Sequence, residues 1–211
     1  MANLPFSIKF YGTTYSEFYV NNNGNITFDT DFGGSGFYTP DTTLTSLGKN
    51  IVAPFWADVD TRDVGSDVVR YGTGTIGGRT AFGANWVNVG YFDTHSDKLL
   101  SVQLILIDRS DIAGGDFDME FNYCKVRWEA GDVSGGSDGF WNGQPTGHFG
   151  GPARVGFASA GGAGFQMNGS GVPGAFLDSN LNTGLIYNSF NSSSSGRYFF
   201  QFRNGIPLQT P

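Results

Sequence analysis

Short apolar runs separated by glycine-rich and acidic joints follow one another through residues 83–136. Within Asp116–Tyr123 every second side chain is apolar, so the apolar side chains share one face of a strand. Asp118 and Glu120 share the opposite face, which we expect to be wet. Leu99–Ile107 is almost unbroken apolar sequence, which predicts a central strand buried on both faces. Helical periodicity is nearly absent, so the chain is predicted to be all-β.

Turn signals separate these runs along the whole chain. Asn21–Gly24 lies between two apolar runs, which is a strong hairpin signal. Residues 29–50 are polar and predict a long loop with one short helical turn around Leu44, Leu47 and Ile51. Further short strands are expected at 154–158, 165–168, 184–187 and 198–202. Together with 33 glycines, this pattern predicts a two-sheet antiparallel β-sandwich with long glycine-rich loops and little helix.

The composition is that of one folded domain over residues 1–211, with 39% hydrophobic and 16% aromatic residues to fill a core. The formal net charge is −7 and basic residues are not clustered, which argues against a nucleic-acid partner. No apolar run approaches the about 20 residues of a membrane-spanning helix, so we expect no membrane insertion of this domain. The one cysteine, Cys124, follows Tyr123 in an expected strand and is predicted to be a buried thiol.

Several sequence blocks together resemble a known family. Phe-Tyr-Gly at 10–12, Tyr-Val-Asn-Asn-Asn-Gly at 19–24 and Ala-Pro-Phe-Trp-Ala-Asp-Val-Asp at 53–60 precede the strands of 83–136, and a further block lies at 171–178. Their order resembles the nidogen-like (NIDO) extracellular domain family. The resemblance implies a non-catalytic adhesion or matrix module, located outside the cell or on its surface within a larger protein. It carries no defined set of binding residues.

The first candidate site is an acidic motif in which Asp58, Asp60 and Asp63 are candidate Ca²⁺ ligands. The spacing does not fit an EF-hand, because Arg62 stands where an oxygen ligand belongs. The alternative is structural: the carboxylates cap turns or pair with Arg62. No cofactor is required on either interpretation, and Ca²⁺ is an optional ligand.

A second candidate is the long glycine-rich loop of residues 131–152. It holds Phe140, Trp141 and His148, and loops on rigid β scaffolds are where binding usually resides. An exposed Trp141 would stack on a sugar ring or anchor a protein partner. The alternative is that Trp141 folds back over the edge of the core.

Catalytic arrangements are weaker candidates. Asp118 and Glu120 lie about 7 Å apart along one strand face, a separation compatible with glycoside hydrolysis, but a wet face would not tune an acid. His95 and His148 fall in separate loops, and no nucleophile-elbow or zinc spacing is present. A second acidic cluster surrounds the turn at 110–115, where turn chemistry and pairing with Arg109 explain the carboxylates. Its members are Asp108, Asp111, Asp116 and Asp118.

The expected function is therefore adhesion or matrix recognition of an extracellular protein or glycan. The alternative is a carbohydrate-binding module of a bacterial adhesin, with or without Ca²⁺, and a glycoside or ester hydrolase is the weakest interpretation. Asn25, Asn168 and Asn191 match the pattern for N-glycosylation, which matters only in a eukaryotic source.

Overall fold

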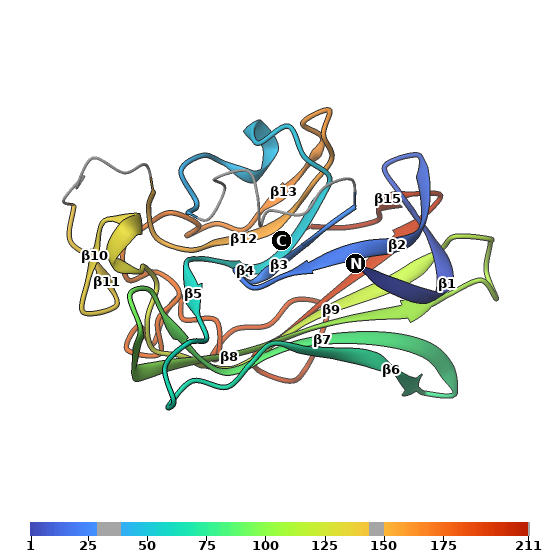
Figure 1. Ribbon diagram of the computed structural model, residues 1–211. Helices are drawn as coiled ribbons and strands as arrows, with labels where there is room; N and C mark the ends of the chain where they lie inside the picture. Colours follow the sequence, from blue (N-terminus) through green and yellow to red (C-terminus); the bar gives the residue numbers. More distant parts are fainter. Residues whose placement is uncertain (29–38, 144–149, 211) are drawn as a thin grey trace.

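The computed structural model describes residues 1–28, 39–143 and 150–210 (Figure 1). Two large antiparallel sheets form the fold, and one of them curls into a half-barrel. The only helical segments described are the single 3-10 turns η1 (Leu44–Ser46) and η2 (Asp132–Ser134). The predictions of an all-β fold with little helix, and of a short helical turn at Leu44, are confirmed.

The first sheet has six strands, and every neighbouring pair is antiparallel. In spatial order the strands are β1 (Ala2–Phe10), β2 (Thr13–Asn21), β3 (Asn25–Thr27), β4 (Ile51–Trp56), β12 (Arg154–Ala158) and β13 (Gly164–Gln166). The predicted hairpin at Asn21–Gly24 is the β2–β3 connection.

The second sheet has seven strands, again antiparallel throughout. In spatial order they are β15 (Ile206–Pro207), β14 (Arg197–Arg203), β9 (Phe117–Val126), β8 (His95–Asp108), β7 (Arg79–Tyr91) and β5 (Val59–Asp60), with β6 (Arg70–Ile76) also paired to β7. A separate two-stranded hairpin is formed by β10 (Gly136–Ser137) and β11 (Phe140–Trp141).

Aromatic side chains from both sheets meet in one core. The ring of Phe10 on β1 stacks on that of Phe202 on β14, with centroids 5.6 Å apart. Phe157 on β12 meets Phe200 on β14 edge-to-face at 5.2 Å. Phe121 is fully buried, as the alternation in its strand predicts. These contacts across the interior fix the two sheets face to face.

Two strand predictions are wrong. β8 is central, between β7 and β9, but its side chains alternate and Gln103 and Ile105 are partly exposed on the outer face. Antiparallel sheets commonly keep one face toward solvent, so this apolar run does not require burial on both sides. Residues 184–187 are turns, because Tyr187 N donates to the carbonyl oxygen of Gly184 rather than to a neighbouring strand.

Cys124 is exposed, which contradicts the predicted buried thiol. Strand alternation explains the difference, since Tyr123 points into the core and the next side chain must point outward. The β8–β9 register also shifts at this point: Val102 pairs with Tyr123 and Ser101 pairs with Lys125, so Cys124 has no partner residue on β8.

Candidate functional site

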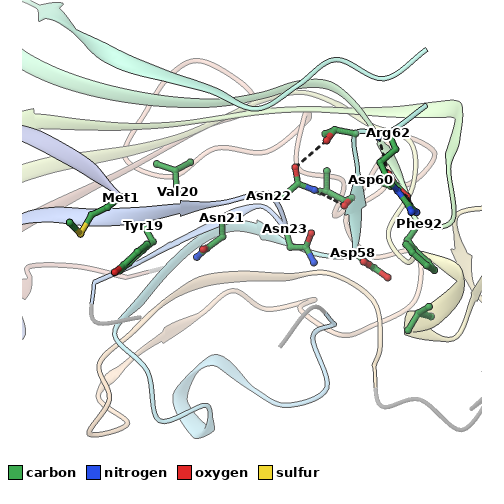
Figure 2. Close-up of a pocket in the computed structure, with 13 residues that line it drawn as sticks. Met1, Tyr19, Val20, Asn21, Asn22, Asn23, Asp58, Asp60, Arg62 and Phe92 are labelled. Atoms are coloured by element: carbon green, nitrogen blue, oxygen red, sulfur yellow. Dashed lines mark hydrogen bonds and ion pairs between the residues drawn. The ribbon is translucent and has the colours of Figure 1, made fainter. Parts of the chain in front are cut away.

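A cavity of about 640 Å³ lies where the β2–β3 turn, the segment after β4 and the β7–β8 turn meet (Figure 2). We call it the β5 pocket, because both residues of β5, Val59 and Asp60, line it. Its size is in the range of small-ligand sites. The lining residues are Met1, Tyr19, Val20, Asn21, Asn22, Asn23, Asp58, Val59, Asp60, Thr61, Arg62, Phe92 and Val133.

The asparagine-rich turn is fixed to the next segment of chain by main-chain and side-chain hydrogen bonds. Phe55 N donates to the carbonyl oxygen of Gly24 at 3.1 Å, and Ala57 N donates to that of Asn23 at 3.3 Å. Gly24 has φ +72°, and a Cβ there would lie 1.8 Å from the carbonyl oxygen of Phe55. Only glycine permits so close an approach, so this residue lets the turn that carries Asn22 and Asn23 lie against β4.

Phe92, in the β7–β8 turn, links two acidic residues. Its main-chain N–H donates to the carbonyl oxygen of Asp58 at 3.0 Å, and its own carbonyl oxygen accepts from Asp132 N at 2.7 Å. Asp58 and Asp132 are therefore held on either side of one residue, although 74 positions separate them in the chain. Asp58 lines the pocket, and Asp132 precedes the lining residue Val133 without lining the pocket itself.

Both carboxylate oxygens of Asp60 accept hydrogen bonds from neighbouring residues. Arg62 Nε lies 2.9 and 3.0 Å from its two oxygens, and the main-chain N–H groups of Arg62 and Thr94 also donate to it. Burial acts to raise the pKa of Asp60, but these hydrogen bonds outweigh it and leave the pKa lowered. The predicted pairing of Arg62 with the acidic motif is confirmed, and Arg62 also bridges Asp93 at 2.8 Å.

Asp58 is placed differently. The residue is 5% exposed, and no other residue in the described ranges forms an ion pair or hydrogen bond with its carboxyl group. Burial raises the pKa of Asp58 to about 7, and the negative charges of Asp60 and Asp132 contribute in the same direction. Arg62 opposes this shift only in part. The pocket therefore contains a buried acid without a partner.

Asp63 lies apart from the other two members of the acidic motif and does not line the pocket. Its Oδ1 accepts from Gly65 N at 2.7 Å and from the hydroxyl of Ser96, and the Ser96 bond is the main reason that its pKa is lowered. It caps a turn, as the structural alternative supposes. Within the described ranges, no three His, Cys, Asp or Glu side chains are grouped to hold a metal ion.

The loop candidates lie on the β10–β11 hairpin, away from the pocket lining. Phe140 is 38% exposed, and the ammonium group of Lys98 sits 5.5 Å from the centre of its ring. Trp141 is half-buried, and its main-chain N–H donates to Glu129 Oε1 at 3.3 Å. His148 lies outside the described residues.

The outer face of β9 is not wet, which corrects a prediction. Asp118 and Glu120 are each 4% exposed, because arginine side chains cover them. Asp118 accepts from Arg109 at 2.7 Å and from Arg203 at 2.6 Å, and Glu120 pairs with Arg197. Polar side chains on a strand face can be buried by long basic neighbours, which alternation alone does not reveal.

The remaining acidic cluster acts in turns and ion pairs, as predicted. Asp108 accepts from Ser110 N at 2.9 Å, and Asp111 bridges Arg109 at 3.0 Å. Asp116 Oδ1 accepts from Asn204 N at 2.8 Å. These contacts give each carboxylate a structural role.

Two kinds of sequence candidate remain: His95, and the three asparagines that match the N-glycosylation pattern. His95 stacks on Tyr91 with ring centroids 4.8 Å apart, and its Nε2 lies 3.2 Å from Asp132 Oδ2. Asn25 is fully buried and donates to the carbonyl oxygen of Asn23, so it is not accessible for glycosylation in the folded domain. Asn168 and Asn191 are exposed.

Sequence reasoning identified Asp58, Asp60 and Arg62 but missed the other residues that line the pocket. Asn22, Asn23 and Phe92 carry no chemical motif, and the asparagine-rich turn was explained by hairpin geometry alone. The available signal was indirect: 19–24 and 53–60 are two of the blocks that resemble the nidogen-like family, and the structure places them side by side.

A sequence profile described as NIDO related matches residues 1–160, about three quarters of the chain. Because this profile matches more than half of an all-β sandwich chain, the chain belongs to the NIDO-related family. It is 29% identical to nidogen of Drosophila melanogaster over 198 residues, covering 84% of this chain and 14% of that protein. It is 27% identical to alpha-tectorin of Mus musculus and of Homo sapiens, covering 63% of this chain and 7% of each relative.

These relatives are extracellular matrix proteins, and the chain spans only a small part of the length of each. No solved structure gives a significant match. Among the described residues there is no helix with the length and apolar character needed to cross a membrane.

Proposed function

We propose that this domain is a non-catalytic recognition module of a larger protein in the extracellular matrix or on the cell surface. Its partner is an extracellular protein or a glycan. Family membership over residues 1–160 carries the proposal, and that stretch supplies every residue that lines the β5 pocket. Coverage of 14% of nidogen and 7% of alpha-tectorin fits one module among several.

Asp118 and Glu120 are the two carboxylates whose separation is compatible with glycoside hydrolysis. Their contacts support a structural role instead. A catalytic carboxyl group must reach the reacting bond, whereas Asp118 and Glu120 are each only 4% exposed beneath arginine side chains. Asp118 has two arginine partners and Glu120 has one. These ion pairs give both carboxylates a structural role, which supports the non-catalytic part of the proposal.

The test uses the purified 211-residue chain on arrays of extracellular matrix proteins and of glycans. We expect saturable binding to at least one array and no turnover of chromogenic glycosides or esters above the buffer rate. Turnover that a single carboxylate substitution abolishes would overturn the recognition proposal.

A second candidate is a carbohydrate-binding module that uses the β10–β11 hairpin. The exposed ring of Phe140 favours it, because sugar rings stack on aromatic faces. Phe140→Ala and Trp141→Ala should then weaken glycan binding and leave the Tm unchanged. Loss of folding in Trp141→Ala would give that side chain a structural role, and repeating the array with EDTA tests for a Ca²⁺ requirement.

A further inference from the structure

The charged groups in and around the β5 pocket carry more negative than positive charge. Asp58 and Asp60 line the pocket, and the negative charges of Asp93 and Asp132, which lie outside the lining, also act on Asp58. Arg62 is the guanidinium that acts on Asp58 in the opposite direction. Arg62 is already bonded to Asp60 and Asp93. The excess of negative charge therefore has no matching cation from the described part of the chain.

Two carboxyl groups at or beside the pocket have oxygens without a hydrogen-bond partner among the described residues. The carboxyl group of Asp58 lines the pocket and makes no hydrogen bond with the described residues, and the residue is 95% buried. Asp132 Oδ1 is also buried without a hydrogen bond in the same ranges, while its Oδ2 meets His95. A buried carboxylate without a partner is unfavourable, so a ligand that supplies N–H donors and a positive charge would be favoured.

The rest of the pocket is suited to an aliphatic chain. In Figure 2 the asparagine side chains lie between Tyr19 and Val20 on one side and the acidic residues with Phe92 on the other. Val133 adds a further apolar surface. The ring of Phe92 already faces one guanidinium, with Arg62 Cζ 5.3 Å from its centre. Apolar walls leading to a buried carboxyl group match a methylene stem that ends in a charged head.

We propose that the β5 pocket receives a lysine or arginine side chain of an extracellular partner protein, whose charged head pairs with Asp58. The stem lies along Phe92, which is on the same side of the asparagines as Asp58. This inference rests on the proposed recognition function and names the partner chemistry of its pocket. A bare Ca²⁺ ion fits less well, because it takes six to eight oxygen ligands and no group of three carboxylates converges among the described residues.

Three synthetic heptapeptides serve as probes: acetyl-Gly-Ser-Gly-X-Gly-Ser-Gly-amide with X as lysine, arginine or norleucine. Amide chemical shifts of the ¹⁵N-labelled 211-residue chain are followed during titration, with Phe92 and Asn22 as reporters. We expect saturable shifts with the lysine and arginine peptides and none with norleucine. Equal responses to all three peptides would overturn the inference, since the pocket would then recognise only an apolar stem.

Asp58→Asn removes the charge and keeps the shape, and we expect it to weaken lysine-peptide binding at least tenfold. The matched control is Asp111→Asn, which removes an equal charge in the β8–β9 turn, outside the pocket, and should change affinity less than twofold. An Asp58→Asn chain that keeps wild-type affinity would overturn the inference. So would saturation of the same reporters by 1 mM Ca²⁺ or a methyl glycoside when the lysine peptide gives no response.

The pH dependence of the affinity for the lysine peptide provides a second readout. Asp58 faces Asp60 on β5, Arg62 after it, Asp93 in the β7–β8 turn and Asp132 on η2. Ionisation of Asp58 on binding should tighten wild-type affinity for the lysine peptide between pH 6 and pH 8, and Asp58→Asn should remove that part of the change. His95, beside Asp132, is present in both chains, so the comparison isolates the contribution of Asp58.

The two proposals fail separately. If wild type and Asp58→Asn bind equally well on the matrix-protein array, recognition stands and the β5 pocket is not its site. If neither array yields a ligand while the lysine peptide still binds through Asp58, the pocket chemistry stands and the recognition function fails.

Discussion

The side-chain amide of Asn22 donates a hydrogen bond of 2.7 Å to the main-chain carbonyl oxygen of Val59. This bond joins a turn of the first sheet to a strand of the second, and Trp86 Nε1 donates at 3.0 Å to the carbonyl oxygen of the same asparagine. The β5 pocket is thus built across the two sheets, and its shape depends on how closely the turn approaches the segment after β4.

Gly24 is a sensitive position because this turn also lies directly against β4 at Phe55. Gly24→Ala should destabilise the domain by at least about 2 kcal/mol, because the new Cβ would meet the carbonyl oxygen of Phe55 and the backbone has positive φ. The control is Gly48→Ala, which has a similar φ of +69° but nothing within 4 Å. It should cost only about 1 kcal/mol. Urea denaturation of both variants measures the difference, and equal losses would contradict the steric explanation.

Asp58 should make stability depend on pH. Its pKa rises from an ordinary 3.8 to about 7 on folding, so the folded state disfavours the charged form. The resulting loss of stability is absent below pH 4, grows as pH rises to 7 and is complete above it. Asp58→Asn should therefore stabilise the domain at pH 8, by on the order of 3 kcal/mol, and by progressively less toward pH 4. Urea denaturation at several pH values should show this; a constant difference would be inconsistent with it.

Phe121 should contribute strongly to stability. It is fully buried, and its ring lies 5.3 Å from that of Phe200. Phe121→Ala should cost about 3–5 kcal/mol in chemical denaturation because it leaves a cavity between the sheets. Val87→Ala on the exposed face of β7 should cost under about 0.5 kcal/mol. A loss below about 1 kcal/mol for Phe121→Ala would place that face of β9 outside the core.

The ion pairs on the outer face of β9 should matter more than those in the turns. Asp118→Asn removes the charged partner of both Arg109 and Arg203 in a site that is nearly closed to solvent, and should cost about 3 kcal/mol. Asp111→Asn, in an exposed pair, should cost less than about 1 kcal/mol. Thermal unfolding of the two variants at one pH compares them directly, and similar Tm values would refute the distinction.

Cys124 should react with a thiol reagent in the native state. Its exposure predicts stoichiometric labelling by a chromogenic disulfide reagent without denaturant. Cys124→Ser provides the blank. Labelling that needs urea would restore the original prediction of a buried thiol.

The fold could be predicted from the sequence because strand alternation and turn chemistry are local. Alternation in Asp116–Tyr123 placed Phe121 in the core, and the Asn-Gly pair placed the β2–β3 hairpin. The same alternation put Cys124 outside, but a free cysteine is among the most often buried residue types, and that tendency led to the opposite prediction. The burial of Glu120 could not be foreseen, because Arg197 reaches it from a strand 77 residues away.

The candidate site was only half predictable for the same physical reason. The acidic motif was visible as sequence, and the pairing of Asp60 with Arg62 is a contact between near neighbours. The isolation of Asp58 was not visible, since it depends on Phe92 and Asp132, which arrive from other parts of the chain. A pocket made by three separated segments has no signature in any one of them.

The position of β14 sets a minimum length for a working fragment. The family match ends at residue 160, yet Arg197–Arg203 closes the sheet beside β9, pairing Phe202 with Phe117 and Tyr198 with Phe121. A chain cut at residue 160 would keep every wall of the β5 pocket and lose the strand that covers this edge. It would present the backbone of β9 and a row of phenylalanines to other molecules, so such a fragment should self-associate before its pocket could be assayed.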